Sequence, residues 1–309
     1  MAKQPEPPCT LVRFQATDGV ELSGLLYEPR RRADAVVAFV HGTGGASIFE
    51  SSRTNLLAHE LVRRGLAFFP FNNRGAHLIR RLSARKGRET TSVDGGMAHE
   101  RIRDCVFDLD GAARLLRHRG YRRLYLAGHS TGANKVAVYD HYKPRNPYRR
   151  YILLGGGDDS GLFYANHGPR RFAAALAKAR ERIRERRGHE LARLPLPAMP
   201  MSWRSLYDMI NPDGDYSVFP FLEVMRGIRL SRRPRFRYLK AIRKPTLVLY
   251  GENDAYCYDD VPGCVAALVE ALGAKPNFEY AILAGADHGF KGKERELGGF
   301  LAAWCLTSS

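Results

Sequence analysis

The sequence predicts an α/β protein whose sheet is mostly parallel and doubly wound. Short apolar runs rich in β-branched and aromatic residues alternate with longer segments that carry apolar residues at helical spacing. This alternation is typical of parallel strands joined by crossover helices. The chain of 309 residues is long enough for one large domain with a sizeable core. We expect an antiparallel hairpin at its start and a largely helical insertion in its second half.

The opening hairpin is predicted around Asp18-Gly19, a turn dipeptide that lies between the apolar runs 10–15 and 20–27. The later segments continue the alternation to the end of the chain. We expect strands at 35–40, 66–71, 123–128, 151–156, 245–250 and 277–283, and helices at 51–65, 101–120, 131–142, 258–272 and 291–304.

Two segments interrupt this alternation. Residues 80–100 are polar and predict a long loop over one end of the sheet. Residues 158–238 separate two strands by more than a crossover needs, and they include a strongly basic helical stretch. We therefore expect a core domain of residues 1–157 and 239–309 and an inserted cap of residues 158–238. In the cap, Met199, Trp203 and Phe219 either line a substrate pocket or anchor the cap to the core.

A serine between glycines follows the strand expected at 123–128. Residues 128–132, GHSTG, match the pattern G-x-S-x-G directly before a predicted helix. A sharp turn between strand and helix exposes the serine oxygen at the edge of the sheet. The helix N-terminus behind it favours developing negative charge. This context favours Ser130 as a nucleophile over a simple glycine turn.

The segment HGTGG, residues 41–45, follows the strand at 35–40. Its glycines allow the backbone to approach a ligand closely. We expect the backbone N–H groups of Thr43 and Thr131 to form an oxyanion hole, with Gly44 as the alternate to Thr43. A phosphate-binding loop is disfavoured because the patterns GxxxxGK[ST] and GxGxxG are absent.

An acid and a histidine complete the set of candidate catalytic residues. Asp254 lies just past the strand at 245–250, and His288 lies in a glycine-flanked loop past the last predicted strand. The other acids considered are Glu252, Asp158, Asp159 and Asp287. We expect Asp287 to anchor a loop, because adjacent side chains diverge and it is the neighbour of His288.

The order of these parts resembles the α/β-hydrolase superfamily, in which serine, acid and histidine follow one another along the chain. The resemblance covers most of the chain except the cap and residues 80–100. It implies the α/β-hydrolase fold. The motifs GHSTG, FNNRG and FPF, together with the long insertion, also look like uncharacterised hydrolases grouped with fungal siderophore esterases.

The resemblance implies a serine esterase that cleaves carboxylic esters with a catalytic triad of Ser130, His288 and Asp254. Thioester, lactone or amide hydrolysis would use the same residues, so these activities stay open. A ligand-binding protein on the same scaffold is a further alternative. The residue type at position 130 argues against dehalogenase or epoxide hydrolase chemistry, in which a carboxylate is the nucleophile. No metal or organic cofactor is implied.

Several residues near these motifs are candidates for a supporting role or for substrate binding. Asn72, Asn73 and Arg74 follow the strand at 66–71 and should lie near the site, with support of the oxyanion loop favoured over substrate contact. The resemblance makes His41 a residue that orders the loop beside the substrate. We expect His129 to point away from the nucleophile and to pack.

The net charge and the cysteine content limit the partners and the cellular location that we expect. The net charge of +17 makes nucleic acid or an anionic surface conceivable, but the positive residues are spread along the chain and no nucleic-acid-binding motif accompanies them. The basic residues could instead steer an anionic or bulky ester. No apolar run is long enough to span a membrane. The five scattered cysteines and the polar start MAKQPEPPCT lead us to expect a cytoplasmic protein.

Overall fold

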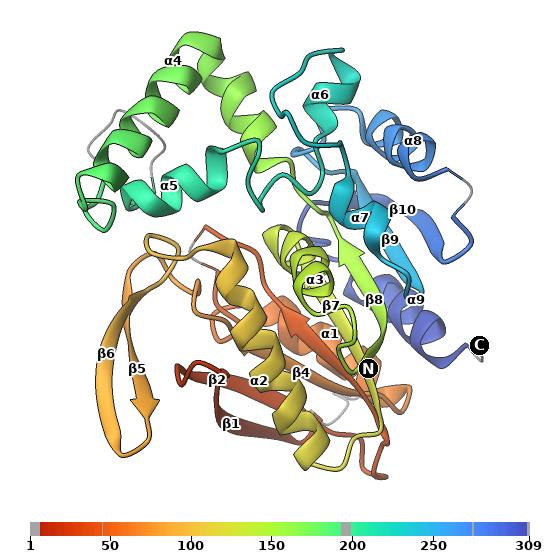
Figure 1. The fold of residues 1–309 in the computed structure, drawn as a ribbon. Helices are drawn as coiled ribbons and strands as arrows, with labels where there is room; N and C mark the ends of the chain where they lie inside the picture. Colours follow the sequence, from red (N-terminus) through yellow and green to blue (C-terminus); the bar gives the residue numbers. More distant parts are fainter. Residues whose placement is uncertain (1–6, 45, 193–198, 274, 308–309) are drawn as a thin grey trace.

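The computed structural model describes residues 7–44, 46–192, 199–273 and 275–307. Within these residues, eight strands form one sheet in the order β1-β2-β4-β3-β7-β8-β9-β10 (Figure 1). Strands β1 and β2 form the antiparallel hairpin at one edge, β2 is antiparallel to β4, and the remaining pairs are parallel. The strands are β1 (Cys9–Gln15), β2 (Glu21–Tyr27), β3 (Ala35–Val40), β4 (Ala67–Asn72), β7 (Arg123–His129), β8 (Tyr148–Leu154), β9 (Thr246–Asn253) and β10 (Phe278–Asp287). The predicted fold class, the α/β-hydrolase fold, is confirmed.

Helices cover both faces of this sheet. One face packs against α2, α3 and α8 and the other against α1 and α9, so each face has its own apolar core. The helices are α1 (Ser52–Arg63), α2 (Cys105–His118), α3 (Thr131–Tyr142), α4 (Asp159–Arg184), α5 (Trp203–Ile210), α6 (Phe221–Met225), α7 (Arg237–Ala241), α8 (Val261–Leu272) and α9 (Glu294–Leu306).

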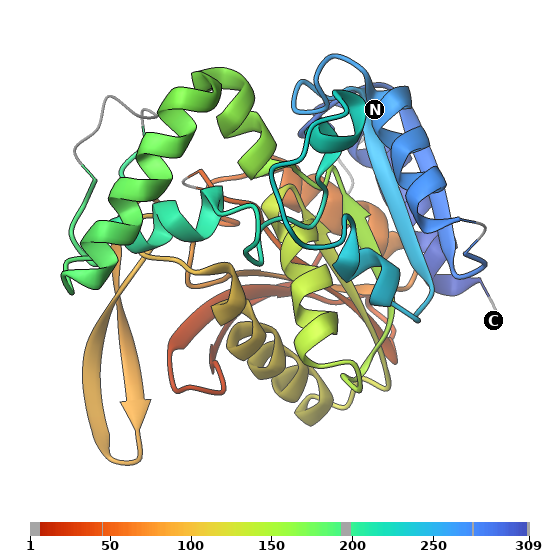
Figure 2. The same ribbon diagram turned by 45° about the horizontal axis from the view of Figure 1, so that its top comes forward.

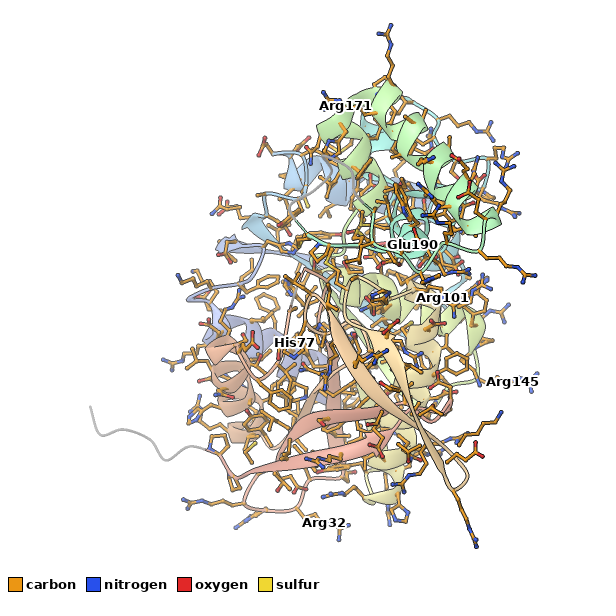
Figure 3. All side chains as sticks on the ribbon, turned by 90° about the vertical axis from the view of Figure 1, so that its left-hand side faces the viewer. Arg32, His77, Arg101, Arg145, Arg171 and Glu190 are labelled. Atoms are coloured by element: carbon orange, nitrogen blue, oxygen red, sulfur yellow. The ribbon has the colours of Figure 1, made fainter. Side chains whose placement is uncertain are left out.

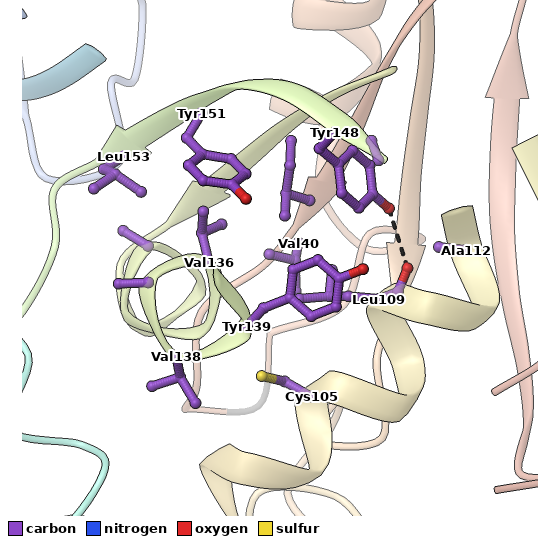
Figure 4. Packing of buried hydrophobic residues seen from close by; sticks show 14 of the residues in the cluster. Val40, Cys105, Leu109, Ala112, Val136, Val138, Tyr139, Tyr148, Tyr151 and Leu153 are labelled. Carbon is purple, nitrogen blue, oxygen red and sulfur yellow. Dashed lines mark hydrogen bonds between the residues drawn. The ribbon is translucent and has the colours of Figure 1, made fainter. Parts of the chain in front are cut away.

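Helix α3, which follows the GHSTG turn, is buried along most of its length. Figure 4 shows Tyr139 of this helix packed beside Tyr148 and above Cys105 of α2. The Tyr148 hydroxyl donates a hydrogen bond of 3.2 Å to the carbonyl oxygen of Leu109. A helix held on all sides in this way gives the residues at its N-terminus a fixed position.

The segment between β8 and β9 contains α4, α5, α6 and α7. Helices α4 and α5 lie together at one end of the molecule, and their facing side chains form a separate apolar cluster with Met97 (Figures 1 and 2). Helix α4 is kinked where Gly168 adopts a φ of 74° before Pro169. The helical insertion into the core is thus present.

The prediction of a loop over residues 80–100 is wrong. Strands β5 (Arg80–Lys86) and β6 (Glu89–Gly95) form a two-stranded antiparallel hairpin, which projects from the molecule in Figures 1 and 2. Its side chains are mostly exposed on both faces, so the apolar alternation that reveals a half-buried strand is missing. Gly87, with a φ of 62°, makes the turn possible.

Part of what the sequence predicted lies outside the described residues. This is true of Gly45 in the HGTGG segment, of residues 193–198 in the cap and of residues 1–6 at the start of the chain. Within the described residues, no helix has the length and apolar character that a membrane crossing requires.

The basic side chains are spread over the surface. Figure 3 shows Arg32, Arg101, Arg145 and Arg171 at well-separated places, from the first strands to the inserted helices. This distribution agrees with the expectation that the positive charge is spread along the chain.

Candidate active site

Ser130 lies at the turn between β7 and α3 with strained backbone angles, a φ of 57° and a ψ of −130°. The flanking glycines allow this turn to close. A Cβ atom on Gly128 would lie 2.2 Å from the carbonyl oxygen of Gly132, and one on Gly132 would lie 2.2 Å from the carbonyl oxygen of Val40. The glycines of GHSTG are therefore required by close backbone contacts on both sides of the serine.

Asp254 and His288 meet at the same edge of the sheet, although 33 residues lie between them in the sequence. The Nδ1 atom of His288 lies 2.9 Å and 2.8 Å from the two carboxylate oxygens of Asp254. The Asp254 side chain is 1% exposed and that of His288 is 19% exposed. The backbone N–H of Tyr256 also donates to Asp254 at 3.0 Å. The buried carboxylate thus holds one imidazole nitrogen and leaves Nε2 available.

The other candidate acids have different partners. Asp158 accepts hydrogen bonds from the backbone N–H groups of Gly161 and Leu222, and burial raises its pKa to about 6. Glu252 accepts a hydrogen bond from the backbone N–H of Gly285. Asp287 accepts one from the backbone N–H of Lys291, a loop contact of the kind that we expected.

Asp159 differs from these acids because one of its carboxylate oxygens is buried with no hydrogen-bond partner among the described residues. Burial raises the pKa of Asp159 to about 6. Of the five candidate acids, Asp254 is the one whose carboxylate forms a hydrogen bond with the His288 side chain.

Ser130 and His288 line the same cavity, which has a volume of about 340 Å³. Within the described part of the chain, no hydrogen bond joins the Ser130 hydroxyl to the imidazole of His288. Apo forms of such sites commonly have a long contact between nucleophile and base, which shortens when substrate binds.

The loop that we predict to supply an oxyanion donor, residues 41–44 and called the oxyanion loop below, lies directly against the serine. A Cβ atom on Gly42 would lie 2.7 Å from Cβ and 3.1 Å from Oγ of Ser130. Thr43 follows Gly42 on this loop. Thr131 is the first residue of α3, where a helix leaves the backbone N–H groups without internal partners. Gly44 is exposed, and a Cβ atom on it would lie 3.6 Å from the sulfur of Met199.

Two contacts of the His41 ring hold this loop in place. Its Nδ1 atom lies 2.7 Å from the carbonyl oxygen of Gly42, and its Nε2 atom accepts a hydrogen bond of 3.3 Å from the backbone N–H of Asn73. These contacts require a neutral ring with the proton on Nδ1. Burial lowers the pKa of His41 to about 3, which agrees with a neutral imidazole. His41 also contributes to the cavity wall.

Asn72 and Asn73 make contacts with residues 41, 47 and 48, and residues 72–74 do not line the cavity. The Asn72 side chain accepts a hydrogen bond of 2.8 Å from the backbone N–H of Ile48 and donates one of 3.0 Å to the hydroxyl of Ser47. The side-chain oxygen of Asn73 accepts a hydrogen bond from Gly75 within its own turn. The arrangement corresponds to the supporting role favoured from the sequence.

Arg74 points away from the cavity. Its guanidinium forms ion pairs with Asp108 at 2.7 Å and Asp18 at 2.9 Å. A guanidinium held by two carboxylates has little freedom to bind a substrate, so its placement in the substrate site is corrected.

The three apolar cap residues separate in the structure. Met199 lies beside Gly44 of the oxyanion loop. Trp203 packs into the apolar cluster of α4 and α5, and Phe219 is fully buried against Gly156. None of the three is among the described residues that line the cavity, so the expected pocket contact is corrected. Trp203 and Phe219 instead anchor the inserted segment by packing.

Sequence reasoning missed one residue of the site and one contact of another. His129, which we expected to pack, does pack against the rings of His288 and Phe290, and its Nε2 atom also lies 2.7 Å from the carbonyl oxygen of His288. Arg53 of α1 donates a hydrogen bond of 2.8 Å to the carbonyl oxygen of Gly289. No local pattern indicates either contact, since each joins segments more than 150 residues apart.

Within the described ranges, no group of three or more histidine, cysteine, aspartate or glutamate side chains is arranged to hold a metal ion. The groups that the site brings together are a hydroxyl on a strained turn, a histidine paired with a buried carboxylate, and backbone N–H groups beside the hydroxyl.

Residues 31–295 match the family described as "Hydrolase_4: Serine aminopeptidase, S33". No curated protein matches the chain. Similar solved structures include a soluble variant of monoglyceride lipase from Saccharomyces cerevisiae in complex with a substrate analog, with a TM-score of 0.63 and 14% identity over 100% of this chain and 98% of the lipase.

Two further structures are similar over most of the chain. Alpha/beta hydrolase GrgF from Penicillium sp. sh18 has a TM-score of 0.60 and 18% identity, over 96% of this chain and 98% of that one. Est1E from Butyrivibrio proteoclasticus with bound ferulic acid has a TM-score of 0.58 and 14% identity, over 96% and 98% of the two chains. At these identities the similarity shows a shared fold.

Proposed function

Because the chain belongs to the serine aminopeptidase S33 family of α/β-hydrolases, we propose that it is a serine hydrolase that cleaves carboxylic esters. The observation that carries this proposal is the pairing of His288 with the buried carboxylate of Asp254, in a cavity that the strained residue Ser130 also lines. The names of similar structures, which include a monoglyceride lipase and Est1E with ferulic acid, support an ester over an amide.

In the proposed first step, Nε2 of His288 takes the proton of the Ser130 hydroxyl while the serine oxygen attacks the ester carbonyl carbon. The Asp254 carboxylate keeps the Nδ1 proton in place and stabilises the imidazolium that forms. The resulting oxyanion accepts hydrogen bonds from the backbone N–H groups of Thr43 and Thr131. Loss of one such donor typically costs about 2.7–4 kcal/mol of transition-state stabilisation.

In the second step the tetrahedral intermediate collapses, the bond to the alkoxy oxygen breaks, and His288 gives its proton to the leaving alcohol. Water, deprotonated by the same imidazole, then attacks the acyl-Ser130 ester. The carboxylic acid leaves, and the proton returns to the serine hydroxyl.

The test is hydrolysis of p-nitrophenyl butyrate by the wild type and by Ser130→Ala, His288→Ala and Asp254→Asn. We expect each variant to lose at least roughly 10³-fold in kcat, because the triad acts as one unit. Matched controls are Ser83→Ala on the exposed hairpin and His118→Ala at the exposed end of α2, which should keep full activity. A folded wild type that hydrolyses no ester of a short- and medium-chain series would refute the proposal.

The same hydrolysis assay can test the finer predictions of the substrate class. Thioesters, lactones and amino-acid amides belong in the substrate series, and so do ester-linked siderophores, since the resemblance to fungal siderophore esterases stays a prediction.

A cytoplasmic location and the division into a core of residues 1–157 and 239–309 with a cap of residues 158–238 also stay predictions. Cell fractionation tests the first, and limited proteolysis, which should cut first in the cap, tests the second.

A further inference from the structure

The cavity beside Ser130 lies on the side of the sheet covered by α1 and α9. Both helices follow strands of the sheet and begin at the edge where the serine lies. The cavity is lined by the first turns of both helices, at Thr54 and Leu57 of α1 and at Glu294 and Leu297 of α9. It therefore extends from the reactive serine down between two helices of the core, away from the α4–α5 pair.

The inner wall of this cavity is mostly apolar, with Ser47 and Thr54 as buried polar residues, and its rim is polar. The inner residues are Phe39, Leu57, Phe68, Leu154, Phe290 and Leu297. The rim carries two acids and one base, Glu50, Glu294 and Arg53, so it presents charges of both signs. A mostly apolar lining of this kind favours an apolar ligand, and its few polar groups fix the orientation of that ligand.

The cavity ends where the two helices touch. A Cβ atom on Gly298 would lie 2.6 Å from Cβ of Glu60, so α1 and α9 are in close contact just beyond Leu57 and Leu297. Leu61 and Leu301, the next inward residues of the two helices, are fully buried. Leu57 lies five residues after Ser52, which is about 7.5 Å along the helix axis. The space is thus a dead end of limited depth.

We propose that this cavity binds the acyl chain of the substrate, a linear apolar chain. This inference rests on the proposed function. The acyl group stays bonded to Ser130 while the leaving alcohol departs and water enters, so a dead end suits the acyl half and an open path suits the alcohol. A volume of about 340 Å³ lies at the lower end of the roughly 300–1,000 Å³ typical of small-molecule pockets, so we expect an acyl chain of medium length.

The experiment compares two ester series in the wild type and in four leucine variants. One series varies the acyl chain of p-nitrophenyl esters from acetate to dodecanoate, and the other varies the alcohol of alkyl acetates. Leu57→Ala and Leu297→Ala enlarge the cavity, whereas Leu61→Ala and Leu301→Ala remove the same atoms one turn further along each helix, outside the cavity lining.

We expect Leu57→Ala and Leu297→Ala to shift the best acyl chain by at least two carbons, with about a tenfold gain in relative kcat/KM for the longest esters. The alcohol series should keep its profile, and the Leu61 and Leu301 variants should keep both profiles. A shift in the alcohol series alone, or equal shifts in all four variants, would overturn the assignment. Leu57→Phe narrows the cavity without leaving a void, and it should shift the profile to shorter acyl chains.

Binding of 1-hexanol, measured by calorimetry, tests the cavity without turnover. The wild type and Ser130→Ala should bind it with similar affinity, and Leu57→Phe should bind it at least tenfold more weakly. If the wild type binds 1-hexanol but cleaves no ester, the proposed function fails and the apolar pocket stands. If the wild type cleaves esters but the Leu57 variants change neither binding nor the acyl profile, the pocket assignment fails and the proposed function stands.

Discussion

The Nε2 atom of His129 lies 2.7 Å from the carbonyl oxygen of His288, so the residue before the proposed nucleophile holds the backbone of the proposed base. The two imidazole rings are 4.9 Å apart between centroids. Burial lowers the pKa of His129 to about 4, so its ring is neutral at pH 7 and can donate from Nε2. Arg53 makes a second link at the next residue, through the carbonyl oxygen of Gly289. The last residue of β7, directly before Ser130, is thereby joined to the loop that carries His288.

The first prediction concerns this link. His129→Phe keeps an aromatic ring but removes the donor, and we expect kcat for p-nitrophenyl butyrate to fall about fivefold with little change in KM, since a hydrogen bond of this kind contributes about 1 kcal/mol. The control is His118→Phe on the exposed end of α2. An unchanged kcat for His129→Phe would show that the contact does not position His288.

The second prediction concerns the oxyanion loop. In Gly42→Ala the new methyl group would lie 2.7 Å from Cβ of Ser130 and must push the loop away from the serine. We expect kcat to fall roughly 10²–10³-fold, the loss seen when one oxyanion donor is removed. Gly157→Ala is the matched control, because its methyl group would meet nothing closer than an Asp159 oxygen at 3.8 Å. Equal activity of the two variants in the hydrolysis assay would contradict the assignment of the loop.

The third prediction concerns pH and His41. Because the pKa of His41 is lowered to about 3 in the folded protein, the unfolded chain binds a proton between the ordinary value of 6.5 and 3 that the folded chain does not bind. The contribution of His41 to stability is therefore complete above pH 6.5 and decreases as the pH falls. Acidification from pH 6.5 to 4 should remove about 3 kcal/mol of it.

Buried carboxylates such as Asp158 act in the opposite direction, since a raised pKa favours the folded state as the pH falls from about 6. Comparison with His41→Asn isolates the histidine, because both proteins share those carboxylates. Urea unfolding at pH 6.5, 5 and 4 should show the stability advantage of the wild type shrinking with acidity. A constant advantage would mean that His41 titrates normally.

The fourth prediction concerns an ion pair buried beside the site. Lys135 of α3 lies 2.6 Å from Glu100, and their side chains are 0% and 1% exposed. A Cβ atom on Gly75 would lie 2.2 Å from the Glu100 carboxylate, so the pair joins α3 to the turn after β4. Lys135→Met leaves an isolated buried acid and should cost about 3–5 kcal/mol of unfolding free energy.

Replacement of both partners, Lys135→Met with Glu100→Leu, removes the isolated charge and should recover most of that loss. The measurement is urea unfolding of the single and double variants at pH 7. A double variant as unstable as Lys135→Met would show that packing, and not the buried charge, sets the cost.

The sequence was sufficient to predict the sheet and to propose the candidate site residues, because the signals for both are local. The strand at β7 and the glycines around Ser130 follow from short patterns, and the positions of Asp254 and His288 follow from the rule that parallel strands end at one edge. The β5–β6 hairpin was missed because both of its faces are polar, so its residues show no alternation of apolar and polar side chains.

What the sequence could not predict depends on contacts between distant segments. Nothing near Trp203 or Phe219 distinguishes an apolar residue that lines a pocket from one that anchors a helix. The cavity walls come from Leu57 and Leu297, which are ordinary apolar positions of two amphipathic helices. Likewise, the sequence alone suggests that Lys135 and Glu100 are surface charges, whereas the structure pairs them in the interior.

The most direct test of the central claim is labelling with a fluorophosphonate, followed by mass spectrometry of the modified peptide. We predict one phosphonyl group per chain on Ser130 in the wild type, and its loss in Ser130→Ala. His288→Ala should label at least roughly 10²-fold more slowly, because the serine then lacks its base. Labelling of a folded wild type at another residue, or undiminished labelling of His288→Ala, would contradict the account of Ser130 as a nucleophile activated by His288.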